Sequence, residues 1–467
     1  MQPVFTRSSE PFVPAAFAPA PDAMGFVRFL RLLLTDAVSA VPERAYHEPI
    51  ATVNVPGTGR PLVAFVSDPT TLEEMLVRRP VDFPKSLIDD RVLRPAFGDS
   101  LLTAHGEDWR WKRRLAAPYF TPAALSARLD DMMAPFDALL DDWTDRGPGT
   151  SIDVAAAMTA ATLEVVRRVL FAGDPKIDVG AIARAIDDYL GPISWLVGLA
   201  SLKTPAWLPH PGRAKLLDGR RRMRAEVDAL VVRQRAAPNA ASGMCAALLD
   251  ARDPATGRRL DDDDLTDMLL TLIAAGHETT ANALAMALYC LAEQPELQDA
   301  LRDEAIATAG DGALSPDHLS SLVLTEAFVR ETLRLFPPAP LMARRNLRTE
   351  TLAGQRLPPG TTLFIPIYAV HRHSGLWHRP ERFDVERHLG ADRDAIGRTA
   401  YMPFGAGPRI CAGQAFAMME MVGALATIVR RVSVGRADRH PVELVHRLTL
   451  RPKNGLMLEM SPVPKRR

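Results

Sequence analysis

One cysteine stands in a loop whose composition suits close contact with a flat bound group. Residues 404–413 read Phe-Gly-Ala-Gly-Pro-Arg-Ile-Cys-Ala-Gly, with the cysteine at Cys411. Glycines permit backbone angles and close approaches that a side chain would forbid. Residues 414–430 predict a helix directly after the loop. A cysteine at a helix N-terminus is favoured as a thiolate, the form that binds metals.

A second set of polar residues interrupts the longest apolar helical pattern of the chain. Residues 275–280 read Ala-Gly-His-Glu-Thr-Thr. Glycine, glutamate and threonine are poor choices for a buried helix interior, so a function should offset their cost. A kink with locally satisfied hydroxyls is the structural alternative. Gly276, Glu278 and Thr279 are therefore candidate functional residues.

Three predicted helices would position the remaining candidates. The pattern around residues 275–280 extends from Asp261 to about Glu293, on the order of 50 Å of helix. Trp109 and Arg113, four residues apart, share one face of a helix that starts near residue 106. Glu331 and Arg334, spaced i,i+3, share a face of a third helix, which stops before two prolines.

Composition restricts the class of protein. The chain has 467 residues, with 56 Lys+Arg balanced by 56 Asp+Glu, so nothing suggests a nucleic-acid-binding protein. Its three cysteines cannot form a disulfide framework, which fits a reducing compartment. No stretch reaches the roughly 18–20 apolar residues of a membrane span. We expect a cytoplasmic protein without a membrane span.

The complete pattern around Cys411 resembles the haem-binding loop of the cytochrome P-450 family. Every fixed position of Phe-Gly-x-Gly-x-Arg-x-Cys-x-Gly is matched. The resemblance implies a mainly α fold with a smaller β-rich part, which is the cytochrome P-450 fold. We expect residues 1–24 to be a Pro/Ala-rich extension, and residues 25–467 to form a single cytochrome P-450 domain.

The resemblance also implies a cofactor, haem b, and the residues that hold it. Thiolate ligation of this haem is the family's known property, and it falls on Cys411. Besides Cys411, the implied cofactor-binding residues are Phe404, Arg409, Trp109, Arg113 and Arg344, with Arg345 as the alternative to Arg344.

In the family, the Ala-Gly-x-Glu-Thr-Thr motif serves dioxygen. By resemblance, Gly276 leaves a groove for dioxygen, Thr279 holds dioxygen and an ordered water, and Glu278 connects that water to bulk protons. We expect Thr280, rotated about 100° around the helix, to face elsewhere.

A buried Glu-x-x-Arg pair closed by a second arginine is a further family feature. Glu331 and Arg334 match the pair. In the family, a Trp-x-x-Pro-x-x-Phe pattern precedes this arginine. If Trp377 begins that pattern, the closing arginine is Arg387. Arg382 is the alternative, because it stands in a Pro-Glu-Arg-Phe segment that is identical to the family's motif of that sequence.

The implied activity is a haem-thiolate monooxygenase that hydroxylates or epoxidises a small apolar substrate, terpenoid, steroid or fatty-acid-like, with dioxygen. Its electrons would come from a separate ferredoxin or flavodoxin with an NAD(P)H-dependent reductase. We expect an acidic donor to dock on a basic cluster made of Arg110, Lys112, Arg113, Arg114 and Arg409. A haem-thiolate peroxygenase or isomerase, and a non-enzymatic haem-based sensor, are the alternatives.

Several local expectations concern the connecting segments. Residues 189–212, rich in tryptophan and leucine, are either core or a mobile lid over the substrate channel. Residues 50–66 predict two strands around a Pro-Gly turn, and residues 361–370 predict another strand. Residues 236–258 predict a loop. Residues 448–460 predict a hairpin with its turn at Asn454-Gly455.

Overall fold

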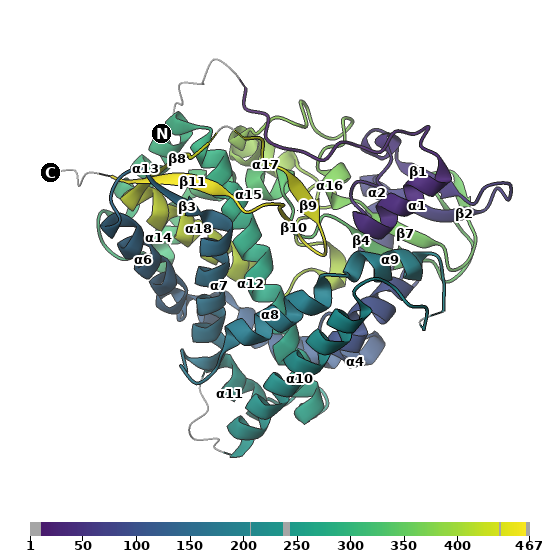
Figure 1. Ribbon diagram of the computed structural model, residues 1–467, viewed down its shortest axis with the longest axis horizontal. Coiled ribbons are helices and arrows are strands. Elements are labelled where there is room, and N and C mark those ends of the chain that lie inside the picture. Colours follow the sequence, from purple (N-terminus) through teal and green to yellow (C-terminus); the bar gives the residue numbers. More distant parts are fainter. Residues whose placement is uncertain (1–10, 206, 237–242, 439, 464–467) are drawn as a thin grey trace.

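A long central helix organises this computed structural model, which describes residues 11–205, 207–236, 243–438 and 440–463. Helix α12, Asp262–Ala292, runs through the molecule with the other helices around it (Figure 1). Asp261 caps it by accepting a hydrogen bond from the backbone N–H of Asp264 at 2.7 Å. Most side chains of α12 are buried on all sides, which confirms the predicted central helix.

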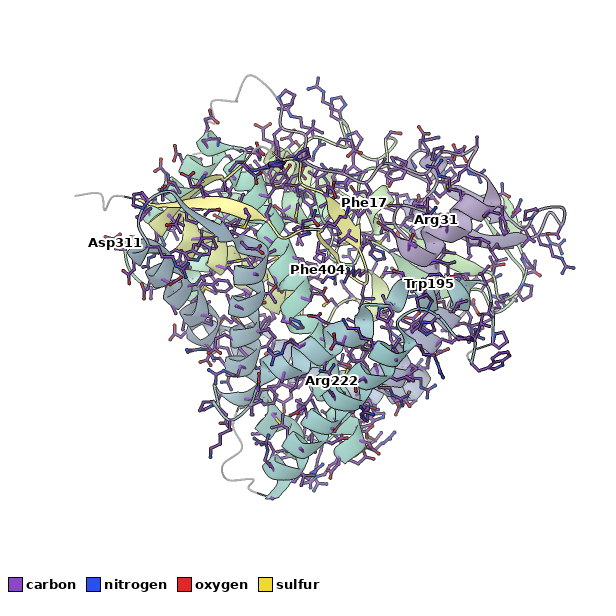
Figure 2. The ribbon with its side chains drawn as sticks, viewed as in Figure 1. Phe17, Arg31, Trp195, Arg222, Asp311 and Phe404 are labelled. Carbon is purple, nitrogen blue, oxygen red and sulfur yellow. The ribbon has the colours of Figure 1, made fainter. Side chains whose placement is uncertain are left out.

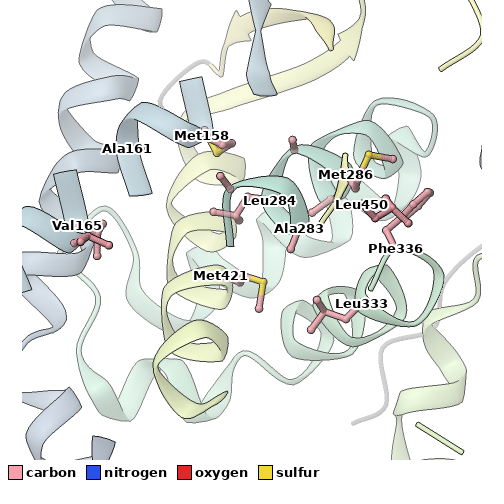
Figure 3. Close-up of a cluster of buried hydrophobic side chains, with 14 of the residues drawn as sticks. Met158, Ala161, Val165, Ala283, Leu284, Met286, Leu333, Phe336, Met421 and Leu450 are labelled. Atoms are coloured by element: carbon pink, nitrogen blue, oxygen red, sulfur yellow. The ribbon is translucent and has the colours of Figure 1, made fainter. Parts of the chain in front are cut away.

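The other helices pack around α12 and against one another. Figure 3 shows their shared core, where Leu284 of α12 lies near Met421 and Leu333 from two other helices. The helix bounds are α1 Phe26–Thr35, α2 Pro69–Glu73, α3 Arg94–Phe97, α4 Gly106–Ala116, α5 Pro122–Ser126, α6 Leu129–Asp145, α7 Val154–Phe171, α8 Val179–Leu190, α9 Ile193–Ser201, α10 Arg213–Ala236, α11 Gly243–Asp250, α13 Pro295–Ala309, α14 Pro316–Ser321, α15 Val323–Leu335, α16 Ile367–Val370, α17 Gly390–Ala395 and α18 Gln414–Arg431.

The strands form small, separate sheets; β1, β2, β7 and β4 lie on the right in Figure 1, and β9 and β10 near its centre. One sheet has the order β1-β2-β7-β4, a second has β3-β11-β8, and β9-β10 and β5-β6 are two-stranded. The strand bounds are β1 Ile50–Asn54, β2 Pro61–Val66, β3 Thr150–Asp153, β4 Met342–Arg345, β5 Glu350–Leu352, β6 Gln355–Leu357, β7 Thr362–Ile365, β8 Val432–Arg436, β9 Leu444–His446, β10 Leu450–Pro452 and β11 Met457–Pro462.

The expected C-terminal hairpin does not form. Strand β10 pairs with β9, whereas β11 lies between β3 and β8. Gly455 has φ +76°, and a Cβ there would lie 2.7 Å from a carboxylate oxygen of Asp153. Asp153 also accepts a hydrogen bond from the Leu456 N–H at 3.0 Å. The turn at Asn454-Gly455 therefore passes the chain from one sheet to another.

Two further segments differ from expectation. Within 236–258 the chain forms α11, because Met244, Leu248 and Leu249 are buried and the helix packs against α7. Residues 237–242 lie outside the described residues. Residues 367–370 form a helical turn, so the strand predicted for 361–370 is limited to β7.

The described part of the N-terminal extension lies against elements far along the chain. Backbone N–H groups of Ala15 and Phe17 donate to the hydroxyls of Tyr289 and Tyr368 at 3.3 and 2.9 Å. The ring of Phe12 packs on Tyr289, with centroids 5.8 Å apart. Residues 1–10 of this extension lie outside the described residues.

Candidate active site

The cysteine loop folds back on itself before α18. The Cys411 N–H donates to the Phe404 carbonyl at 2.9 Å, which closes the loop. Gly405 and Gly407 have φ +77° and +73°. A Cβ on Gly407 would lie 1.9 Å from the carbonyl oxygen of Leu76. Only glycine fits at that position, so the loop is held tightly against the segment after α2.

Cys411 is exposed, whereas Cys245 and Cys290 are buried. Protein nevertheless encloses much of the thiol, so that burial affects its pKa. This burial raises the pKa of the thiol and outweighs the Gly413 N–H and the charge of Arg113, which both lower it. This shift opposes the thiolate form that we expected the helix N-terminus to favour. A bound metal would itself displace the proton.

Cationic side chains from three segments gather beside the loop. Arg344 of β4 lies near Arg409 of the loop, and burial together with the charge of Arg344 lowers the pKa of Arg409 to about 10. Lys85 belongs to the same group, and burial and both arginines lower its pKa. Its amino group lies 3.4 Å from the Asp89 carboxylate. Arg409 Nη1 is buried without a hydrogen-bond partner among the described residues.

This cluster fits the two carboxylates of a haem. Half-buried cations that repel one another need anionic partners, and Asp89 supplies only one negative charge. Arg344, rather than Arg345, faces the cluster, because Arg344 interacts with Lys85, Arg409 and Asp89. Nothing in the local sequence around Lys85 indicated its place here, because that place depends on an isolated bridge to Arg344.

Helix α4 brings its two candidate residues to the cysteine loop. The guanidinium of Arg409 lies over the Trp109 ring, 4.1 Å from its centroid. Arg113 is half-buried; burial lowers its pKa, and an interaction with Cys411 opposes that shift. Trp109 and Arg113 therefore both face the loop, from one side of the helix.

The basic cluster expected to receive an electron donor is largely neutralised. Lys112 is buried, with its amino group 2.6 Å from Asp264. Arg114 makes two hydrogen bonds to Asp253, at 2.8 and 2.9 Å. Exposed Arg110 pairs with Glu107 at 3.1 Å. Three of the five cations of the expected cluster, Arg110, Lys112 and Arg114, are therefore bound to acidic neighbours, and within the part of the chain that the structure describes only Arg113 and Arg409 are not paired in this way.

The middle of α12 is more exposed than the turns on either side of it. Ala275 is exposed and Thr279 is half-buried, although most of this helix is buried. Thr279 Oγ1 donates to the Ala275 carbonyl at 2.8 Å, whereas Thr280 is 3% exposed. A Cβ on Gly276 would lie 3.1 Å from Val166, so packing on α7 also requires a small residue there.

Glu278 is held by the segment that ends in β10. Thr449 Oγ1 donates to Glu278 Oε1 at 2.6 Å, and Arg451 Nη1 lies 3.5 Å from the same oxygen. Thr449 also accepts a hydrogen bond from Asn282 Nδ2 at 3.2 Å. These contacts join residues about 170 positions apart, and no local pattern in the sequence indicated them.

The Glu331–Arg334 pair is fully buried, with two hydrogen bonds of 2.8 Å. Arg387 Nε lies 3.5 Å from Glu331, whereas Arg382 offers its carbonyl oxygen to Arg334. His388, which the sequence did not indicate, lies 3.0 Å from the other Glu331 oxygen. Burial alone would raise the pKa of Glu331, but Arg334 and His388 lower it to about 2.

The lid candidates divide between packed and exposed positions. Helix α9 packs on α1, where a Cβ on Gly198 would lie 2.2 Å from the Leu34 side chain. Figure 2 shows Trp195 of α9 below Arg31 of α1, and Phe404 of the cysteine loop nearer the centre of the molecule. Trp207, beyond α9, is 73% exposed.

Comparisons with known proteins agree with this arrangement. A family model described as cytochrome P-450 matches residues 44–460. Cyclooctatin synthase of Streptomyces melanosporofaciens is 34% identical over 352 residues, covering 72% of this chain and 73% of the relative. Pentalenene oxygenase of Streptomyces avermitilis is 33% identical over 384 residues, covering 80% of this chain and 83% of the relative. The crystal structure of the cytochrome P450DA heme domain superposes with TM-score 0.82 at 25% identity, covering 97% and 99% of the chains.

Proposed function

Because this chain belongs to the cytochrome P-450 family and is a monooxygenase that binds haem b, we propose that Cys411 supplies the thiolate ligand of the iron. The observation that carries the proposal is the exposed Cys411 in a loop next to the half-buried cations Arg344, Arg409 and Lys85. When bound, haem supplies the redox chemistry that activates dioxygen. Arg409, Arg344 and Lys85 would bind its carboxylates, with Trp109 supporting Arg409.

The test is the spectrum of the reduced protein with carbon monoxide. The parent protein should show the red-shifted Soret band of a thiolate-ligated haem, and Cys411→Ala should lose it. Cys245→Ala is the matched control, because Cys245 is a buried free cysteine of α11. A normal thiolate spectrum in Cys411→Ala would overturn the assignment.

The distal side is assigned to α12. We propose that Thr279 orients dioxygen and an ordered water beside it, and that Glu278 passes protons to that water, as a positioned acid–base group does. Gly276 leaves room for dioxygen. The exposure of Ala275 and Thr279 within an otherwise buried helix supports this placement.

For the substrate we propose an apolar compound, with a terpenoid hydrocarbon preferred over a steroid or fatty acid. Apolar walls select by shape with few polar anchors, and leucine and methionine precede Arg344 on the chain. One relative is named for pentalenene, a hydrocarbon. A spectral screen of pentalenene, limonene, steroids and fatty acids should reveal the spin-state change of substrate binding. Tight binding only of small charged compounds would contradict the proposal.

We propose that electrons come from a separate ferredoxin or flavodoxin with an NAD(P)H-dependent reductase, and that the protein acts in the cytoplasm. Among the described residues, no helix is both long and apolar enough to cross a membrane. Product formation that requires NAD(P)H and a donor would support the monooxygenase cycle. Product formation with peroxide alone, at the same rate, would favour the peroxygenase alternative.

A further inference from the structure

The glutamate to which we assign proton delivery is fastened at one carboxylate oxygen. Thr449 donates to Glu278 Oε1 at 2.6 Å, and Arg451 lies 3.5 Å from that same atom. Both contacts are made to Oε1, and neither is made to Oε2. The carboxylate is therefore anchored on the side of β10, and its second oxygen is available to exchange protons with water.

The direction of the hydrogen bonds follows from Asn282. A threonine hydroxyl has a single proton to donate and can also accept. Because Asn282 Nδ2 donates to Thr449 Oγ1, the Thr449 proton is free to point to Glu278. Asn282 lies one helical turn after Glu278 and is 7% exposed, so little water competes for its amide.

Arg451 alone does not set the orientation of Glu278. Its distance of 3.5 Å exceeds that of a good hydrogen bond. Arg451 also acts on Asp187 of α8, whose pKa is raised by burial and by the charge of Glu278, and lowered by His277 and Arg451. The arginine is thus shared between two carboxylates, whereas the Thr449 contact is directed and short.

We propose that Thr449 is a positioning residue for dioxygen reduction, which holds Glu278 in the orientation that passes protons toward Thr279. Asn282 sets the direction of the Thr449 hydroxyl. In each transfer Glu278 gives a proton to the ordered water and regains one from solvent, while Thr449 keeps its own. This proposal rests on the function proposed above for Glu278.

The first experiment removes the hydroxyl without changing the shape of the residue. Thr449→Val in the haem-loaded protein should slow dioxygen consumption roughly 10-fold, the effect of losing one hydrogen bond to a charged group. The donor system and the best compound of the spectral screen are used throughout. The carbon monoxide spectrum and the spin-state titration should not change. Thr449→Ser should restore the rate and the parental solvent isotope effect.

Two further variants control and sharpen the result. Thr427→Val should behave as the parent, because the Thr427 hydroxyl is buried but bonds to Gly423 within α18. Asn282→Asp should slow dioxygen consumption as Thr449→Val does, because its carboxylate would compete with Glu278 for the one Thr449 proton. Parental rates in Thr449→Val and Asn282→Asp would overturn the proposal.

A double-mutant cycle tests the contact without turnover. Thr449→Val and Glu278→Gln should each lower the urea midpoint of unfolding, and the double variant should fall no further than the larger single change. Fully additive changes would show that the two side chains do not interact. If Glu278→Gln consumes dioxygen normally, the proposed proton role of Glu278 fails. If Glu278→Gln is slow and Thr449→Val is not, only the positioning role fails.

Discussion

The two neighbouring threonines of α12 differ in what they face. Thr279 is half-buried beside exposed Ala275, whereas Thr280 is 3% exposed. We expect Thr279→Ala to bind haem and substrate normally but to divert much of the consumed dioxygen to hydrogen peroxide, because the ordered water loses its anchor. Thr280→Ala should stay coupled to product. The ratio of product to peroxide is the measurement, and the reverse pattern would show that the catalytic hydroxyl has been assigned to the wrong residue.

The arginines around Glu331 make unequal contributions. Arg387 faces the buried carboxylate at 3.5 Å, whereas the Arg382 contact to Arg334 uses its backbone carbonyl. Removing one partner of a buried pair costs roughly 3–5 kcal/mol, so Arg387→Ala should yield little haem-loaded protein. Arg382→Ala keeps the carbonyl and should be mild. The yield of folded haemoprotein measures both, and a collapse of Arg382→Ala alone would contradict this account.

Acid should destabilise the protein through Glu331. Its folded-state pKa of about 2 lies below the ordinary value of 4.5. The stabilising effect is therefore fully present above about pH 4.5 and is lost as the pH falls from 4.5 toward 2. The free energy of unfolding, measured with urea, should decrease as the pH falls through this range, because unfolding lets Glu331 take up a proton. The side chain in Glu331→Gln cannot titrate. If the free energy of unfolding of that variant falls as steeply with pH as that of the parent, Glu331 does not cause the acid sensitivity.

The cysteine loop depends on the segment after α2 as much as on its own residues. Gly407→Ala would place a Cβ 1.9 Å from the Leu76 carbonyl, at a backbone φ of +73°. We expect this variant to lose haem affinity and the thiolate spectrum, because the loop must move away from its support. Gly435→Ala in β8 is the control, since a Cβ there meets nothing within 4 Å. Equal haem content in both variants would disprove the steric argument.

Salt should have little effect on reduction by an electron donor. Three of the four cations of α4, Lys112, Arg114 and Arg110, are bound to Asp264, Asp253 and Glu107. Paired charges produce a weaker long-range field than free ones, and salt screens what is left. We expect the rate of reduction by a surrogate ferredoxin to change by less than about threefold between low and physiological salt. A steep decrease with salt would indicate another basic surface.

At the scale of the whole molecule, the N-terminal segment 11–24 packs against elements far along the chain. Phe12 contacts Tyr289 of α12 and Phe383, and the Phe383 N–H donates to the Phe12 carbonyl at 3.1 Å. Phe12→Ala should lower the free energy of unfolding by about 1–2 kcal/mol, the loss expected for a half-buried aromatic ring. Val13→Ala, at a side chain 58% exposed, should change it by less than about 0.5 kcal/mol. Thermal or urea unfolding of the two variants checks this difference.

Local patterns in the sequence were sufficient for the family, the central helix and the cysteine loop. Glycines at Gly405 and Gly407 predict the tight turn, because glycine readily adopts positive φ. The helical period around Glu278 and Thr279 predicts which of the neighbouring threonines turns away. Such signals need only residues a few positions apart, so they can be read without knowledge of the fold.

Contacts between distant segments were decided by the tertiary structure alone. The sequence did not indicate that Lys85 would join Arg344, that Thr449 would hold Glu278, or that β11 would leave its expected hairpin. Neither did it show that Lys112 and Arg114 of α4 would pair with acidic side chains from distant segments. A sequence pattern encodes backbone conformation and the face of each element. Which faces meet depends on the packing of the whole core, and that packing determines the partners of every charge and hydroxyl in the site.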